Sequence, residues 1–458
     1  MEARSLAFII QSCAGELRQG APEIQVTGVC TDSRAAGVGD VFVALKGDLF
    51  DGHNFLTEVA LKGVAAVVIN RSRVPAELPA CAVIVVEDTR RALGQLGARY
   101  REQFSLPKIA VGGSNGKTTT KELIAAVLRQ QFKTLWSQAS FNNDVGVPAT
   151  LLRLEAIHQT AVFEVGTNHP GELKPLLDLI RPDYGVITSI GREHLEFFGN
   201  LNGVVAEEGV LGESLSPTGK LFLGGDSEWA DQLAQRSVAP VVRVGLSPNC
   251  EWRARNVCLT ASGTTFEVSG PNALFDGAYA VKLLGRHQVV NALLALALGA
   301  ELGLSPEQVR AGLLECEPAK MRMQPWTWNG VRILDDAYNA NADSMQAALE
   351  TIRELQCEGR KIAVLGDMAE LGQYAPEAHE EVGRRAAASG LAQLFAVGKM
   401  SGVMAGAARG AGMSAVAEFA DVSSAAAAVK GFVRSGDVML LKASRSTRLE
   451  RLSEALRS

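Results

Sequence analysis

The stretch Ile109–Glu122, "IAVGGSNGKTTTKE", decides the fold of the largest part of this chain. A short apolar run leads into it and an amphipathic run follows, which is the pattern of a strand, a glycine-rich loop and a helix. Gly112, Gly113 and Gly116 allow backbone amides to curl around an anion, and Lys117 adds a positive charge. The stretch therefore predicts a phosphate-binding loop. A chance Gly-Lys-Thr in a glycine-rich turn is the alternative.

The spacing of this loop departs from the usual GxxxxGK[ST] pattern, because its first glycine would fall at Val111. Thr118 stands where a hydroxyl can hold Mg²⁺ at a helix N-terminus. Leu123 and Val127, with Ile124 and Leu128, give the helix a buried face. The strand, loop and helix context is the one that a phosphate loop requires.

The composition indicates a globular protein of several domains. At 458 residues the chain exceeds what one core usually fills, and 47% hydrophobic residues argue against disorder. A net charge of -5 gives no basic footprint for nucleic acid, and seven cysteines without a CxxC pair indicate neither a disulfide framework nor zinc. No apolar run reaches the roughly 18 residues that span a bilayer. We expect a cytoplasmic monomer without membrane insertion.

The order of apolar runs predicts three α/β domains. Residues 1–86 carry short strands around one helix, as in a small mixed α/β unit; residues 87–316 alternate strands and helices, as in a parallel sheet. The segment "LECEPAKMRMQPW", 314–326, has two prolines and no periodicity and is interpreted as a linker. Residues 317–458 then predict a Rossmann-like open sheet.

Polar residues directly after predicted strands are the candidates for a site, because ligands of such sheets bind beyond the carboxyl ends of strands. Glu164 closes "TAVFE" and His194 follows "VITSIGREH". Alone, each is more simply a satisfied polar group at a strand end. Beyond neighbouring parallel strands, however, both would lie at the edge that holds the phosphate loop. Their joint placement favours metal binding.

Further polar clusters have open alternatives. Asn142 and Asn143 in "SFNNDVGVP" are consistent with either a substrate contact or an ordinary Asx turn. His287 and Asn291, four residues apart, could either form hydrogen bonds to a nucleotide base or make an interhelical contact. "KASRSTRLE" is either a solvated charge run or an anion site. Polar residues at strand ends of the last domain are more typical of a site than of structure; they are Asp335, Asp336, Tyr338, Asn339, Asn341, Asp367 and Glu370.

These motifs, in this order, resemble the ATP-dependent Mur ligases of peptidoglycan synthesis over essentially the whole chain. "GSNGKTTTKE" resembles their phosphate loop, whose shorter glycine spacing accounts for Val111. "FNNDVGVPATLL", "FEVGTNHPGE", "REHLEFFG" and "GRHQVVNALLA" are similar to successive blocks of the central domain. "TDSRAAGVGDVFVALKGDLFDGHNF" resembles a uridine-nucleotide domain. "LDDAYNANADSM" and "VLGDMAELG" resemble the branch that adds the terminal dipeptide, and the DNP[RA] signature of the third-residue adders is absent.

The resemblance implies an activity. ATP would convert the terminal carboxylate of UDP-MurNAc-tripeptide to an acyl phosphate, which the amine of D-Ala-D-Ala would then attack. ATP and Mg²⁺ are the implied cofactors, and the partners are these two small molecules. The third domain would close over the centre and exclude water. Rival hypotheses are another ligase of the family, such as the third-residue adder or a polyglutamate-type enzyme, and a phosphate-loop ATPase that does not ligate.

The resemblance also implies roles for individual residues. Lys117, Glu164, His194 and Glu208 are the expected catalytic residues, and Thr118, Glu164, His194 and Glu208 the metal ligands. ATP is expected on Gly113, Ser114, Asn115, Gly116, Lys117, Thr118, Thr119, Asn291, Arg322 and Asp336. The other substrates are expected on Ser33, Arg34, Lys46, Asp51, Gly52, His53, Asn54, Asn142, Asn143, Tyr338, Asn339 and Asn341.

Three positions depart from the family pattern. Ser140 stands where asparagine is frequent, Ala443 where the last block has glycine, and Glu208 where most members have a carbamylated lysine. Glutamate needs no modification to offer two oxygens to a second Mg²⁺. We therefore expect Glu208 to replace the carbamate, with Glu207 facing elsewhere on its helix. A solvent-facing glutamate in an acidic pair is the alternative.

Overall fold

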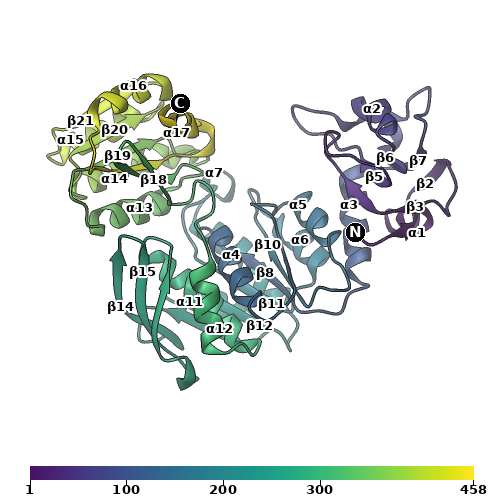
Figure 1. Ribbon diagram of the computed structural model, residues 1–458, viewed down its shortest axis with the longest axis horizontal. Helices are drawn as coiled ribbons and strands as arrows, with labels where there is room; N and C mark the ends of the chain where they lie inside the picture. Colours follow the sequence, from purple (N-terminus) through teal and green to yellow (C-terminus); the bar gives the residue numbers. More distant parts are fainter. Residues whose placement is uncertain (458) are drawn as a thin grey trace.

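The computed structural model describes residues 1–457 as three α/β domains in chain order (Figure 1). Each domain has its own main sheet, of five, nine and six strands. The central domain lies between the other two, with the N-terminal domain in purple and the third domain in yellow-green (Figure 1). The predicted three-domain α/β fold is confirmed, whereas the domain limits expected from the sequence stay predictions. No helix among the described residues has the length and apolarity to cross a membrane.

The N-terminal sheet has the order β2-β7-β6-β5-β4, with β2 antiparallel and the others parallel. Its inner strands are apolar and buried on both faces, as parallel strands between helices are. The elements are β1 (Arg4–Ser5), α1 (Leu6–Ser12), β2 (Glu16–Gln19), β3 (Gln25–Val26), β4 (Gly28–Cys30), β5 (Asp40–Val43), α2 (Leu56–Leu61), β6 (Ala66–Asn70) and β7 (Ala82–Val86).

The central sheet runs β16-β15-β14-β13-β12-β11-β8-β10-β9. Strands β9 to β14 and β8 are parallel, and β15 and β16 extend the edge antiparallel. The strands are β8 (Lys108–Gly112), β9 (Thr134–Trp136), β10 (Thr160–Glu164), β11 (Tyr184–Ile187), β12 (Lys220–Gly224), β13 (Val241–Gly245), β14 (Trp252–Thr260), β15 (Gly263–Ser269) and β16 (Gly277–Val281).

The helices of the central domain cover both faces of this sheet. Helix α4 follows β8 and packs its apolar face, which includes Leu123 and Val127, against α11 and α12. The helices are α3 (Thr89–Arg101), α4 (Lys117–Leu128), α5 (Gly146–Leu151), α6 (Leu173–Ile180), α7 (Leu195–Phe198), α8 (Leu201–Glu208), α9 (Val210–Glu213), α10 (Ala230–Arg236), α11 (His287–Glu301) and α12 (Pro306–Glu315).

The third sheet has the order β17-β18-β22-β19-β20-β21 and is parallel except for β17 at its edge. Its elements are β17 (Gln324–Trp328), β18 (Val331–Asp336), α13 (Ala342–Glu354), β19 (Lys361–Gly366), α14 (Ala375–Ala387), β20 (Gln393–Val397), α15 (Ser401–Gly410), β21 (Val416–Phe419), α16 (Val422–Phe432), β22 (Val438–Lys442) and α17 (Glu450–Arg457).

One prediction about this region is wrong in part. The segment 314–326 was expected to be a linker throughout, but its last residues, from Gln324, form the edge strand β17. Pro325 is tolerated there because an edge strand pairs on one side only, with β18. The connection between the domains is therefore shorter than the sequence pattern indicates.

Candidate active site

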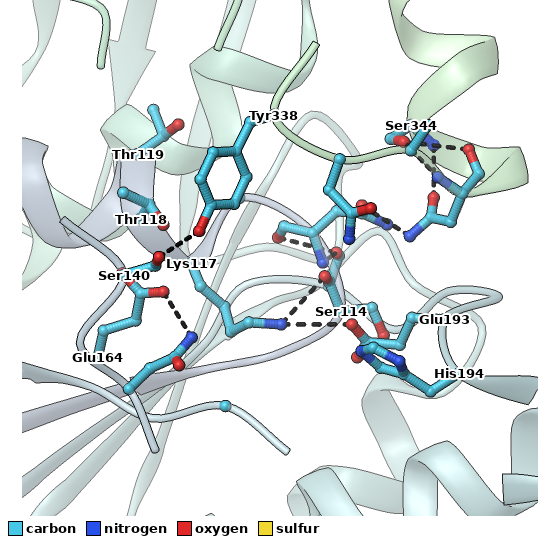
Figure 2. A pocket seen from close by; sticks show the side chains of 18 of the residues that line it. Ser114, Lys117, Thr118, Thr119, Ser140, Glu164, Glu193, His194, Tyr338 and Ser344 are labelled. Atoms are coloured by element: carbon cyan, nitrogen blue, oxygen red, sulfur yellow. Dashed lines mark hydrogen bonds and ion pairs between the residues drawn. The ribbon is translucent and has the colours of Figure 1, made fainter. Parts of the chain in front are cut away.

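A cavity of about 990 Å³ lies between the central and third domains and contains most of the expected site residues (Figure 2). The phosphate loop, the ends of β10 and β11 and the start of α11 line it from the central domain. Residues after β18 and Lys442 at the end of β22 line it from the third domain. Because β8 lies between β10 and β11 in the sheet, the residues that follow these three strands meet at one edge.

The phosphate loop is held by the segment that follows β11. Ser114 N donates to Ser189 O (2.7 Å), and Asn115 N donates to the Ser189 hydroxyl (3.1 Å). Gly113 has φ +108°, and a Cβ there would lie 2.4 Å from the Thr188 hydroxyl, so only glycine fits. Helix α4 begins at Lys117, and its first amides have no intrahelical partner. The loop amides of Ser114 and Asn115 are thus used internally, whereas the N-terminus of α4 presents free amides to the cavity, as an anion site requires.

Lys117 lines the cavity, with its side chain between those of Glu164 and Glu193 (Figure 2). Its Nζ donates to the carbonyl oxygens of Gly113 and Ser114 and lies 3.3 Å from Glu193 Oε2. Burial alone would lower the pKa of Lys117, but the carboxylates of Glu193, Glu208 and Glu164 outweigh burial and raise it. Lys117 is therefore fully charged at neutral pH.

Thr118 and Glu164 carry unpartnered polar atoms that fit a magnesium ion. Thr118 Oγ1 and Glu164 Oε2 are buried without a hydrogen-bond partner, while Glu164 Oε1 accepts from Asn142 Nδ2 (3.0 Å). A buried oxygen of this kind is costly unless a ligand satisfies it, and Mg²⁺ prefers oxygen ligands and keeps several waters. Residues 1–457 contain no cluster of three or more His, Cys, Asp or Glu side chains positioned to hold a metal without further ligands.

His194 is turned toward the third domain. It follows β11, adopts a left-handed backbone conformation with φ +47°, and its Nδ1 lies 2.5 Å from Glu370 Oε2. The pKa of Glu370 is lowered, chiefly by this hydrogen bond from His194. The structure therefore does not bring His194 together with Glu164 and Glu208 into one ligand set, and its metal role stays a prediction.

Glu208 and Glu207 face different elements. Glu208 is buried beneath the phosphate loop, outside the cavity lining, and its Oε2 accepts from Gly113 N (2.6 Å). Burial raises the pKa of Glu208 to about 7, while Lys117 opposes this rise. Glu207 accepts from the amides of Gly171 and Leu173 (2.8 Å each) and so caps the start of α6. Neither is the solvent-facing glutamate of the alternative interpretation.

The polar residues of the central domain divide between the cavity and internal turns. Asn142 and Asn143 both line the cavity, but Asn143 Oδ1 accepts from Val145 N and Gly146 N, which is the Asx turn considered above. Asn291 lines the cavity with its Nδ2 donating to Gln288 Oε1 (2.9 Å). Thr119 also lines it.

The third domain contributes Arg322, Asp336, Tyr338 and Asn339 to the cavity. The Arg322 guanidinium stacks over the Tyr338 ring at 4.2 Å, and the Tyr338 hydroxyl is hydrogen-bonded to Ser140 of the central domain. Asp336 is already engaged, because Oδ2 pairs with Lys442 Nζ (2.6 Å) and Oδ1 accepts from Met323 N (3.0 Å). Lys442 also donates to Asn339 O (3.2 Å).

Asn341 has a structural and an interdomain contact. Its Oδ1 accepts from Ser344 N (2.8 Å), which caps the N-terminus of α13. Its Nδ2 donates to Asn115 Oδ1 of the phosphate loop (3.0 Å). The third domain is therefore in direct contact with the loop.

The residues expected on the uridine side lie apart from this cavity, since Ser33, Arg34, Lys46 and 51–54 are absent from its lining. Asp51 Oδ1 accepts from His53 Nδ1 (2.6 Å), and His53 Nε2 accepts from Asn70 N (3.0 Å). Arg34 forms a fork with Asp32 and is 88% exposed at its side chain. Asp51 and His53 are thus used to fix their own loop, and their contact with substrate stays a prediction.

Two buried charged residues of the site were missed by the sequence analysis. Glu193 contacts Lys117, and the fully buried Lys121 donates to Ala139 O (2.6 Å) and lies 3.7 Å from Glu164 Oε2. The adjacency of Glu193 to His194 was a usable signal. Lys121 lies one helical turn after Lys117, on the side of α4 that faces β10, which a helical projection of the motif would have indicated.

Comparison with known proteins gives three matches to family models along the chain. They are the Mur ligase family catalytic domain at residues 25–101, the Mur ligase middle domain at 111–299 and the Mur ligase glutamate ligase domain at 321–445. Together with the phosphate loop and the three-domain fold, these matches define an amide-forming, ATP-using class of enzyme. The chain belongs to the Mur ligase family.

Within that family, the chain is similar to curated UDP-N-acetylmuramoyl-tripeptide--D-alanyl-D-alanine ligases. The Escherichia coli K12 protein is 37% identical over 96% of each chain, and the Bacillus subtilis 168 protein 35% identical over 100% of this chain and 99% of its own length. A MurF crystal structure from Acinetobacter baumannii covers both chains fully with a TM-score of 0.90 and 30% identity. Thermotoga maritima MurF in complex with ADP has a TM-score of 0.80 and 25% identity, covering 93% of this chain and 96% of its own.

Proposed function

We propose that the protein joins D-alanyl-D-alanine to UDP-N-acetylmuramoyl-tripeptide at the expense of ATP, which yields the UDP-linked pentapeptide precursor of peptidoglycan. One observation carries the proposal: a single cavity places a phosphate loop of the central domain against polar groups of the third domain. A ligase of this kind needs such an arrangement, because the nucleotide, the carboxylate and the amine must meet. The similarity to relatives with this printed activity spans 96% or more of the chain.

The chemical requirement is activation of a carboxylate, which at neutral pH is a poor electrophile. Transfer of the γ-phosphoryl group to the terminal carboxylate of the tripeptide forms an acyl phosphate and releases ADP. The amine of the dipeptide then attacks the acyl carbon, and inorganic phosphate leaves as the amide bond forms. Positioning and charge neutralisation account for most catalysis of this type.

Lys117 and the N-terminus of α4 suit the phosphoryl side of this reaction. The buried, charged Nζ and the free amides face the cavity, where low water content strengthens their interaction with a transferring phosphoryl group. Lys117 exchanges its contacts with the Gly113 and Ser114 carbonyls for phosphate oxygens when ATP binds. Glu193 holds the ammonium group in line until then.

Thr118 and Glu164 are the residues that would hold Mg²⁺, since their unpartnered oxygens face the same cavity. A bound Mg²⁺ would neutralise charge on the β- and γ-phosphates. Asn142 orients Glu164 through Oε1, and Oε2 makes no hydrogen bond but lies 3.7 Å from Lys121 Nζ, so a cation would share this oxygen with Lys121. His194 and Glu208 are kept as proposed ligands of a second ion, which requires His194 to leave Glu370 and Glu208 to leave the Gly113 amide.

The third domain completes the site on the amine side. Arg322 is stacked on Tyr338 and so is preorganised to meet nucleotide or substrate, whereas Asp336 would have to release Lys442 or the Met323 amide to do so. Closure over the phosphate loop excludes water, which would hydrolyse the acyl phosphate. We propose a monomer that acts in the cytoplasm on these small molecules.

The test is ADP release by the purified protein. We expect release only when UDP-MurNAc-tripeptide and D-Ala-D-Ala are both present, because the carboxylate is needed for phosphoryl transfer and the amine for turnover. Robust turnover with ATP alone would instead support a phosphate-loop ATPase. A third-residue adder would instead turn over with UDP-MurNAc-dipeptide and a single diamino acid, and would not use D-Ala-D-Ala.

A further inference from the structure

The segment between β11 and α7 contacts both the phosphate loop and the third domain. Gly191 N donates to the Ser114 hydroxyl (2.9 Å), which ties the segment to the loop. Immediately after Gly191 come Arg192, Glu193 and His194; Glu193 touches Lys117, while the other two pair with carboxylates of the third domain. Helix α7 lies where the central domain meets the third domain (Figure 1). The segment is thus placed to link the position of the third domain to the phosphate loop of the central domain.

Arg192 makes the densest of these contacts. Its Nε and Nη2 donate to Asp343 Oδ1 (3.0 and 2.7 Å), and its backbone amide donates to Asp343 Oδ2 (2.6 Å). Its Nη1 donates to Glu381 Oε2 (2.6 Å). Asp343 lies in the first turn of α13 and Glu381 on α14, so one residue of the central domain grips two helices of the third.

The environment strengthens this contact relative to an ordinary surface ion pair. The side chains of Arg192, Asp343 and Glu381 are only 29%, 35% and 25% exposed. Burial alone would lower the pKa of Arg192, but the hydrogen bonds to Glu381 and Asp343 outweigh burial and raise it. A fork held by several charge-assisted hydrogen bonds fixes orientation as well as distance.

Other polar contacts across the same interface involve fewer bonds. Arg286 pairs with Glu354 at the far end of α13, with an arginine side chain that is 51% exposed. The Tyr374 hydroxyl donates to Gly199 O (3.1 Å), and Asn341 donates to Asn115. Arg192 is therefore the contact whose loss should weaken domain docking most.

We propose that Arg192 is a latch that holds the third domain over the phosphate loop before substrates bind. The role rests on the proposed function, because ATP is taken as the ligand that benefits from a closed site. Arg192 is a positioning residue, since it acts through α13 and α14 and does not touch the reacting groups. Asn341 is the N-cap of α13, and Asp336 at the end of β18 precedes it in the same domain.

Population shift gives the expected kinetic effect. If only the closed arrangement binds ATP fully, the apparent Kd for ATP equals the intrinsic Kd divided by the fraction of molecules that are closed. Removal of the latch should raise the KM for ATP about tenfold, within the usual range of interdomain coupling. The kcat at saturating ATP should change less than the KM, because bound ATP itself restores closure.

The first experiment measures the shape of the substrate-free protein by small-angle X-ray scattering. Arg192→Ala should give a larger radius of gyration than wild type, and addition of ADP with Mg²⁺ should reduce the difference. Arg286→Ala is the matched control, because it removes another interdomain pair to α13 and should leave the radius unchanged. An Arg192→Ala protein that is folded and has the wild-type radius would refute the latch.

The second experiment is a double-mutant cycle on the KM for ATP. Glu381→Gln tests the latch from the third domain and guards against misfolding of the Arg192 variant. Arg192→Lys retains charge but not the fork, so its KM should lie between those of wild type and Arg192→Ala. If both partners act through one contact, Arg192→Ala with Glu381→Gln should cost no more than Arg192→Ala alone. Additive effects would contradict the proposal.

These readouts separate the latch from the proposed reaction. Scattering reports domain closure in a protein that has no substrate, so the latch is testable even if no peptide ligation is detected. Conversely, ligation with unchanged scattering and unchanged KM in Arg192→Ala would leave the proposed function intact and remove the latch.

Discussion

The phosphate loop and the Asp51–Asn54 loop of the N-terminal domain were both expected to bind parts of a nucleotide, yet they treat their polar atoms differently. Beside the phosphate loop, the buried Thr118 Oγ1 and Glu164 Oε2 lack hydrogen-bond partners, although Glu164 Oε2 lies 3.7 Å from Lys121 Nζ. In the N-terminal loop, His53 uses both ring nitrogens within the domain, one on Asp51 and the other on the Asn70 amide.

This difference separates residues that await a ligand from residues that build the frame. A buried polar atom without a partner is costly in the free protein and gains from a ligand. A side chain whose polar atoms are all hydrogen-bonded within the protein gains little from a ligand, because it must first break one of those hydrogen bonds. Two loops that are both expected to bind a nucleotide can therefore have unequal roles, and substitutions should reveal the contrast.

The largest effect is expected at Lys117. Lys117→Ala should lower the rate of ADP release about 100- to 1000-fold, because a charge aimed at the transferring phosphoryl group is lost. It also leaves Glu193 and Glu208 without their buried cation, so stability must be measured alongside activity. Lys117→Arg keeps the charge and serves as the control for folding. A Lys117→Ala enzyme with near-normal activity would mean that the loop is not the phosphate site.

The next effect concerns the adjacent carboxylates Glu208 and Glu207. Glu208→Ala should raise the Mg²⁺ concentration needed for half-maximal activity and cut turnover about 10- to 100-fold. Glu207→Ala should cost stability at the start of α6 but little turnover. Glu208→Lys should be more active than Glu208→Ala only when bicarbonate is supplied, because the lysine would have to be carbamylated to offer the same oxygens.

A further variant sharpens the same comparison. Glu208→Gln retains an acceptor for the Gly113 amide but has no charge. Impaired Mg²⁺ dependence in this variant supports a ligand role. If Glu208→Gln instead matched wild type, Glu208 would belong with His53 among the residues that only support a loop.

An intermediate effect is expected from His287, a cavity residue whose partners lie inside the protein. Burial lowers the pKa of His287 to about 4, with Asp336 partly opposing this change. The unfolded chain therefore takes up a proton at His287 as the pH falls below about 6.5, whereas the folded protein does so only near pH 4. The free energy of unfolding consequently decreases as the pH falls from 6.5 toward 4. Between pH 7.5 and pH 5, the free energy of unfolding measured in urea should fall by about 2 kcal/mol less in His287→Gln than in wild type. Equal losses in the two proteins would show that His287 can be protonated in the folded state.

The smallest effect is expected at His53. His53→Ala should lower stability by about 1 to 2 kcal/mol, because the Asn70 amide loses its acceptor. It should raise the KM for the uridine nucleotide and leave the KM for ATP unchanged, since His53 lies outside the cavity. A large rise in the KM for ATP would break the distinction between the two loops.

Much of the fold followed from apolar runs and the strand-end rule. Glu164 ends β10 and His194 follows β11, the two strands that flank β8, as expected from parallel order alone. The pairing of His194 with Glu370 and of Arg192 with Asp343 was beyond the sequence, because such contacts depend on how two domains dock. Strand β17 was missed because Pro325 argues against a strand, although Gln324–Trp328 alternate between half-buried and exposed residues. The sequence could not fix which way Glu208 faces, because a shift of one residue in matching the family pattern would exchange Glu208 and Glu207 on the helix.

Helix α3 has a consequence for how the molecule melts. Its apolar residues, Leu93 and Leu96 among them, belong to one continuous core with Leu6 of the N-terminal domain and Leu151 of the central domain. The third domain has separate cores on the two faces of its sheet. Calorimetry should therefore show the first two domains unfolding as one cooperative unit and the third as another. The uridine side and the phosphate loop would then keep a fixed separation during turnover, and the third domain would supply the motion.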